Sequence, residues 1–284
     1  MKTLFVPFIA LAMLFTGVAT ASAADAPDVY VQKLVKEAAA GNGAALWNAL
    51  PEDYQGDIED LVEEFGNNMD AELWNKGFKL VGKLAKVMKE KKEFVLGAEV
   101  AKLVPGPQKD ELTKNWDAIA DALATAASSD ISTLDGVKDL DIGEFFEKSG
   151  GKFVGGLIKA SENNPQVSEG IKKLKSVKVS LVSKEDDEAV LKFEAEGEEP
   201  KEEKYTLVSG KWLPTEMVDG WDDAMEKAKA QLGALKIPAE QKVQVITVMS
   251  AVDGVLDQLL TAKDQETFNA QLGGLMSLFG GGAR

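Results

Sequence analysis

The chain has no histidine, no cysteine and a single arginine, and these absences exclude several kinds of chemistry. Without His there is no Ser-His-Asp or Cys-His catalytic machinery and no imidazole ligand for a metal. Without Cys there is no disulfide, thiolate nucleophile, zinc-thiolate site, iron–sulfur cluster or lipid-modified cysteine of a bacterial lipoprotein. A catalytic site would have to use carboxylates, Lys, Tyr, Ser, Thr or a metal ion bound by oxygen.

The charge balance is acidic. The 284 residues carry 32 Lys and Arg against 47 Asp and Glu, which is a formal net charge of −15, and the single arginine is the last residue, Arg284. Nucleic-acid binding needs clustered positive charge, and contacts to base edges favour the guanidinium group of Arg. We therefore expect no nucleic-acid partner and interpret the acidic charge as a feature that keeps the chain soluble.

The N-terminus predicts export. Met1-Lys2 is a positive start, Leu4 to Val18 is almost wholly apolar, and Ala21-Ser22-Ala23 is a small-residue cleavage site. This pattern is typical of a secretory signal peptide, which we place at residues 1–23. Loss of Lys2 changes the net charge to −16. We expect a periplasmic or secreted protein.

The remaining chain predicts no membrane span. Its longest apolar region, 243–260, is interrupted by polar residues that include Asp253 and Asp257. We therefore expect no transmembrane segment once the signal peptide is removed.

The spacing of apolar residues predicts a mostly helical α+β fold. Residues 24–130 follow a helical period throughout, with a stop at Gly66-Asn67-Asn68, a capping residue at Asp70 and a break at Pro105-Gly106-Pro107. We expect this N-terminal half to be a helical region.

Residues 131–279 predict an α+β region. After Val177 the apolar period changes to two, which predicts three antiparallel strands in a meander, with one covered face and one polar face. The third strand is expected to run through Tyr205, Leu207 and Trp212-Leu213. Helices that begin near Pro214, Pro238 and Asp264 are expected to pack on this small sheet, and the glycine-rich tail, 280–284, is expected to be disordered.

A switch of charge separates two neighbouring predicted helices. No basic residue lies between Lys36 and Lys76, and four acids of that interval share one helix face: Asp53, Asp57, Asp60 and Glu64. From Lys76 to Lys92 seven lysines accompany a single acid, Glu90. We expect the two charged faces to pair in a helical hairpin; the alternative is a cation site with oxygen ligands on the acidic face.

Other polar patterns point to structure rather than chemistry. Neither Asp135 nor Asp139 begins a register that fits an EF-hand loop, so we interpret this acidic segment as turns and helix caps, with Asp141 and Glu144 as a capping box. Four of the five Trp precede Asn or Asp, which we interpret as buried Trp followed by outward polar residues. No motif selects a catalytic pair of carboxylates, and we assign no catalytic residue, metal site or cofactor.

Two short segments resemble known families. Val208-Ser209-Gly210-Lys211-Trp212-Leu213-Pro214 resembles the Gly-Lys-Trp strand end of exported bacterial proteins of the nuclear-transport-factor-2-like superfamily. Leu46-Trp47-Asn48-Ala49-Leu50-Pro51 is similar to a segment of uncharacterised exported proteins of planctomycete type. The superfamily includes both enzymes and binding modules, so the resemblance implies no activity. Its catalytic members often use an Asp-His pair, and this chain has no His.

The sequence thus favours an exported, non-catalytic protein that binds a small apolar ligand or an envelope protein. The first alternative is a hydrolase or isomerase that uses carboxylates, with or without a divalent metal. The second is a structural protein that packs between surface-layer or envelope components.

Overall fold

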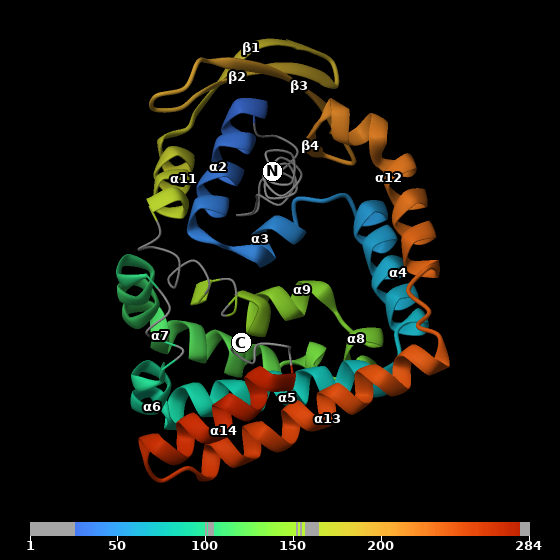
Figure 1. The fold of residues 1–284 in the computed structure, drawn as a ribbon. Helices are drawn as coiled ribbons and strands as arrows, with labels where there is room; N and C mark the ends of the chain where they lie inside the picture. The colour runs from blue at the N-terminus through green and yellow to red at the C-terminus, as the bar shows by residue number, and fades with distance from the viewer. Residues whose placement is uncertain are drawn as a thin grey trace. The chain divides into compact units, whose positions relative to one another are not determined.

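The computed structural model describes residues 26–99, 101, 105–151, 153, 155–156 and 165–278. This part of the chain is mostly helical and carries one small antiparallel sheet, as the sequence predicts (Figure 1). The predicted signal peptide (1–23) and the predicted disordered tail (280–284) lie outside the described residues.

The chain divides into two compact units, and each unit is assembled from three separate segments. The first unit comprises Met1–Phe65, Leu140–Gly155 and Pro165–Ala234. The second comprises Gly66–Asp139, Gly156–Asn164 and Leu235–Arg284. The sequence-based division into a helical region, 24–130, and an α+β region, 131–279, rests on secondary-structure content alone and stays a prediction.

The first unit holds the sheet. Its elements, in chain order, are α2 (Pro27–Ala40), α3 (Gly43–Trp47), α4 (Glu52–Asn68), α9 (Ile142–Phe145), the π-helix η3 (Phe146–Gly150), α11 (Pro165–Ser176), β1 (Lys178–Glu185), β2 (Glu188–Glu194), β3 (Lys201–Val208), β4 (Lys211–Pro214) and α12 (Thr215–Gly233). The last three residues of α4 are assigned to the second unit.

The described elements of the second unit are all helical. They are α5 (Ala71–Glu90), α6 (Lys92–Gly97), α7 (Gly106–Ala127), η2 (Asp130–Ser132), α8 (Leu134–Lys138), α13 (Ala239–Thr261) and α14 (Gln265–Leu278).

The sheet has four strands, and the prediction of three is wrong. The strands follow one another in the order β1-β2-β3-β4, and every neighbouring pair is antiparallel. The predicted third strand is a hairpin, because Ser209 (φ 48°) and Gly210 (φ 79°) turn the chain between the paired residues Val208 and Lys211. Two successive residues with positive φ match the twist of a two-residue hairpin turn, and the Ser-Gly dipeptide is its sequence signal.

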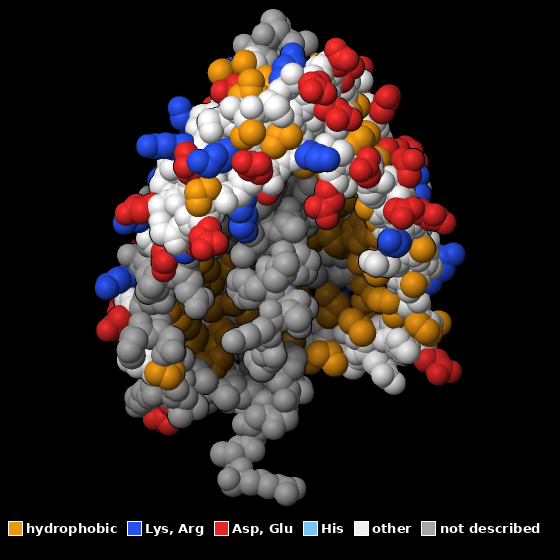
Figure 2. Space-filling view, turned by 90° about the horizontal axis from the view of Figure 1, so that it is seen from above, with side chains coloured by type: hydrophobic (Ala, Val, Ile, Leu, Met, Phe, Trp, Pro, Cys, Tyr) orange, Lys and Arg blue, Asp and Glu red, His pale blue; other side chains and the backbone are white. Residues whose placement is uncertain are grey.

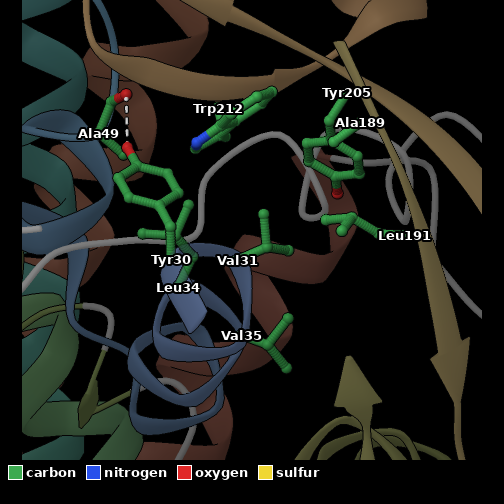
Figure 3. Packing of buried hydrophobic residues seen from close by; sticks show 9 residues of the cluster. All are labelled: Tyr30, Val31, Leu34, Val35, Ala49, Ala189, Leu191, Tyr205 and Trp212. Carbon is green, nitrogen blue, oxygen red and sulfur yellow. Dashed lines mark hydrogen bonds between the residues drawn. The ribbon is translucent and has the colours of Figure 1, made fainter. Parts of the chain in front are cut away.

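Helix α2 covers one face of the sheet (Figure 1). Figure 3 shows its side chains meeting those of the strands around Leu191, which has no exposed surface. Tyr30 is 1% exposed, its hydroxyl donates to the carbonyl of Ala49 at 3.5 Å, and burial raises the pKa of Tyr30 to about 12. Burial also raises the pKa of Tyr205 across this core. The covered face therefore holds the main apolar core of the first unit.

The opposite face of the sheet is polar, as the alternating pattern predicts. Lys192 of β2 and Glu202 of β3 are cross-strand neighbours. Lys192 forms an ion pair with Glu194 of its own strand at 2.8 Å. Figure 2 shows Lys side chains and Asp and Glu side chains next to one another on the described part of one face of the molecule.

At the β1 edge of the sheet, a side chain occupies the start of the strand. Gln32 of α2 donates to the carbonyl of Val177 at 3.1 Å and accepts from the amide of Val179 at 2.9 Å, so its amide group takes the place of a neighbouring strand. The pairing of β1 with β2 shifts register between Leu181 and Ser183. The Gln32 hydrogen bonds and the register shift both discourage addition of another strand at this edge.

Three predicted helix caps are confirmed. The side chains of Asp70, Asp141 and Asp264 each accept a backbone N–H three residues further along, at 3.1, 2.8 and 2.7 Å. Each carboxylate satisfies a donor that has no partner within the first turn of its helix.

The sheet offers a matched pair of substitutions. Leu191 and Leu181 are direct cross-strand partners, but Leu191 is fully buried and Leu181 is 41% exposed. We expect Leu191→Ala to lower the free energy of unfolding by about 2–5 kcal/mol, because it opens a cavity under α2. Leu181→Ala should cost roughly 1 kcal/mol or less. Urea denaturation of both variants checks this, and equal losses would contradict the placement of the core under β2 rather than under the edge strand β1.

Candidate interaction surface

Helix α13 carries an apolar stripe along its whole length. It begins after Pro238 and runs for 23 residues to Thr261. The stripe repeats at spacings of three and four residues, which places its members on one helix face: Val245, Val248, Val252, Val255 and Leu259.

The C-terminal half of this stripe is covered. Leu256 and Leu259 of α13 are 4% and 2% exposed and belong to a cluster with Phe268 of α14, which is 1% exposed. Val252 and Val255 pack against the same cluster, and Leu272 of α14 joins them. α14 runs back alongside α13 (Figure 1), so the two helices share this core.

The lysine block, Lys76 to Lys92, makes most of its ion pairs with α13 and α7. Lys83 contacts Asp253 at 2.7 Å and Asp257 at 2.6 Å, and Lys79 contacts Asp253 at 3.6 Å. The remaining five lysines have these partners: Ser250 for Lys76, Glu90 for Lys86, Asp121 for Lys89, the carbonyl of Ala262 for Lys91 and Asp117 for Lys92. The predicted pairing of this block with the acidic helix is wrong, because acids on α13 and α7, distant in sequence, take the lysines instead.

These contacts shift the pKa values of the paired groups. The hydrogen bond from Lys83 holds the pKa of Asp253 below its ordinary value of 3.8. Burial acts to lower the pKa of Lys83, but its hydrogen bonds to Asp253 and Asp257 outweigh that effect and raise the pKa. At the start of α13, the hydrogen bond from Lys242 lowers the pKa of Asp70 in the same way. Charge contacts therefore attach one side of α13 to α5 at two points.

The N-terminal half of the apolar stripe is uncovered. Val245 is 42% exposed and Val248 is 46% exposed, and Val243, on another face of the same helix, is 64% exposed. In the segment that leads into the helix, Leu235 and Ile237 are 37% and 40% exposed. Large apolar side chains gathered in this way are typical of a surface that another molecule covers.

No charge interrupts this surface. Between Lys242 and Asp253 the sequence has no charged residue, although the chain as a whole has a net charge of −15. By length and composition, α13 is the one helix of the described residues that could cross a membrane, with a mean hydropathy of 1.4 and only 11% of that stretch buried. The absence of a membrane span stays a prediction.

The acidic face of α4 takes part in an aromatic contact that the sequence did not indicate. The indole N–H of Trp221, on α12, donates to Asp57 at 2.7 Å. Tyr54 stacks on Trp221 with ring centroids 4.0 Å apart and planes 7° apart. Burial raises the pKa of Tyr54, and the charges of Asp222 and Asp57 add to this. Asp57 and Trp221 lie 164 residues apart in sequence, so no local pattern could reveal the pair.

The Trp residues lie largely as predicted. Trp47, Trp116 and Trp221 are 5%, 4% and 8% exposed, and the indole N–H of Trp116 donates to the carbonyl of Met88 at 2.8 Å. Trp74 is half-buried, and the Asn75 that follows it accepts the amide of Leu134 at 2.8 Å. The prediction that Asn75 points outward is therefore incomplete, because its side chain links α5 to α8.

Two other kinds of candidate site, a metal site and a ligand pocket, have weaker support. Within the described residues no three acidic side chains are grouped closely enough to hold a metal ion. A shallow, open depression of about 340 Å³ lies beside α2 and β1, and its lining residues are Asp28, Val29, Gln32, Lys33, Lys36 and Val179. Two of those residues, Gln32 and Val179, are already hydrogen-bonded to each other.

Comparison of the chain with protein-family models, with curated proteins and with solved structures finds no match. The two resemblances noted from the sequence therefore stay predictions.

The contact between α5 and α13 should depend on pH. A folded-state pKa below the ordinary value adds stability that is present above that value and lost as the pH falls through the lowered pKa. We expect Asp253→Asn to cost roughly 1 kcal/mol at about pH 7, and the difference from the unchanged chain to be smaller at about pH 3.

Urea denaturation at both pH values checks this expectation. Asp257→Asn is the matched control, because its side chain is 59% exposed and contacts Lys83 alone among the lysines of α5, so its effect should be smaller. A cost for Asp253→Asn that is the same at both pH values would contradict the ionic origin of the contact.

Proposed function

We propose that this chain is an exported, non-catalytic protein that docks a helix of another envelope protein on the uncovered half of α13. The observation that carries the proposal is the exposure of Val245 and Val248 on a stripe whose other half is a packed helix–helix core. A stripe with this spacing accepts a second helix whose apolar side chains repeat in the same way.

The surroundings of the stripe favour a protein helix over other occupants. An anionic lipid surface would repel a chain with a net charge of −15. A small apolar ligand is better held in a concave pocket than on the convex side of a helix. Strand addition at β1 is disfavoured at the start of the strand, where Gln32 bonds to Val177 and Val179.

Site-specific photo-crosslinking tests the proposal. A benzophenone amino acid in place of Val248 should, in the native envelope, yield an adduct with one protein, joined within a helix that carries an apolar stripe. The same group in place of Val29, which is 55% exposed on α2, is the matched control and should not yield this adduct.

Substitutions sharpen the same experiment. With the photo-reactive group at Val248, Val245→Lys should reduce the adduct about tenfold or more, which corresponds to ~1.4 kcal/mol of binding free energy. Thr247→Lys adds the same charge off the stripe and should have little effect. The proposal fails if the adduct joins lipid or a second copy of this chain, if the Val29 position gives the same adduct, or if none forms.

A further inference from the structure

The depression beside α2 and β1, in the first unit, lies on a part of α2 that the core does not use. The face of α2 that packs on the sheet carries Val31 and Val35 (Figure 3), whereas the depression is lined by a neighbouring face. Its volume of about 340 Å³ is at the lower end of the range for small-molecule pockets, roughly 300–1,000 Å³. The depression is therefore large enough for one small ligand.

The floor of the depression is already satisfied in its hydrogen bonds. The side chain of Gln32 donates to the carbonyl of Val177 at 3.1 Å and accepts from the amide of Val179 at 2.9 Å. Covering a polar group that has no partner is costly, but these groups are paired with one another. An apolar group can therefore lie against this floor without leaving an unpaired donor or acceptor.

The walls supply apolar surface. Val29 of α2 is 55% exposed, and Val179 of β1 is half-buried. Leu181 follows Val179 by two residues, so it lies on the same face of the sheet, and it is 41% exposed. A ligand with an apolar chain would remove this surface from water.

The charges along α2 are arranged with opposite signs at the two ends of the depression. Lys33 and Lys36 are three residues apart, so their side chains are neighbours on the helix surface. Among the described residues neither lysine forms an ion pair, in contrast to most lysines of the block on α5. Asp28 lies eight residues before Lys36, which is about 12 Å along the helix. The lysine end thus favours an anion and the Asp28 end disfavours one.

We propose that this depression binds a monocarboxylate that carries a medium-length apolar chain. The carboxylate lies between Lys33 and Lys36, where two ammonium groups donate charge-assisted hydrogen bonds to it. The chain covers Val29 and Val179 and extends toward Asp28, whose negative charge selects against a ligand with a second carboxylate. The site belongs to the first unit and does not depend on the docking proposed at α13.

Calorimetric titration of the purified chain with decanoate, kept below the concentration at which it forms micelles, tests the proposal. We expect one saturable site. Lys33→Gln with Lys36→Gln should weaken the affinity about tenfold or more, because the carboxylate loses both ionic partners. The matched control is Lys227→Gln with Lys229→Gln, which removes the same charge from α12, a helix that packs beside β3 and β4. It should change the affinity by about twofold at most, because distant exposed charges are screened.

Two further measurements define the ligand and the place where it binds. Decanedioate has the same chain length with a second carboxylate, and it should bind about tenfold more weakly than decanoate because that group lies near Asp28. In NMR spectra, decanoate should shift the side-chain amide signals of Gln32 in the unchanged chain and not in the variant without Lys33 and Lys36. Val248→Ser, on the exposed stripe of α13, should leave the affinity unchanged.

Three results would overturn the inference. They are the absence of saturable decanoate binding, equal affinity in the Lys33→Gln, Lys36→Gln variant, and loss of binding in Val248→Ser while the Gln32 signals stay fixed. The last result would place the apolar chain on α13 instead. The titration contains no partner protein, so failure of the crosslinking experiment leaves this site standing, and failure of the titration leaves the docking surface standing.

Discussion

Helix α13 has more apolar surface than its described neighbours cover. This excess of apolar surface determines where the second unit can bind another molecule. One side of the helix is held to α5 by Asp253, and the C-terminal half of its apolar stripe is sealed by α14. The N-terminal half has no comparable cover, so Val245 and Val248 remain accessible. Since apolar surface is stabilised by leaving water, a contact at this position is favourable for any helix of matching shape.

The two sides of α13 serve different purposes. The contacts of Asp253 with Lys83 and Lys79 are directional and orient α13 on α5, whereas the burial of Leu256 and Leu259 supplies most of the stability. Within the described residues, Val245 and Val248 on the exposed side have no packed apolar cluster against them. An interaction there can form and dissociate without disturbing the core, which suits a docking surface.

Much of the local structure could be predicted because its causes are local. Asp70 and Asp264 cap helices through carboxylates placed three residues before the amides they accept, and the alternation around Leu191 marks a strand with one covered face. The division of one predicted strand into β3 and β4 was missed, although Ser209-Gly210 was its local signal. A short apolar run on both sides of a turn has the same period as one continuous strand.

The sequence by itself determined the helices, their caps, the polar and apolar faces of the sheet, and the chemistries closed to a chain without His and Cys. Only the tertiary structure decided partners, because contacts between distant segments leave no local pattern. Lys83 could have paired with any of many acids, and packing selected Asp253 and Asp257. The apolar stripe of α13 was readable in the sequence, but which half is buried depends on where Phe268 and Leu272 of α14 pack against it, and only the tertiary structure shows that.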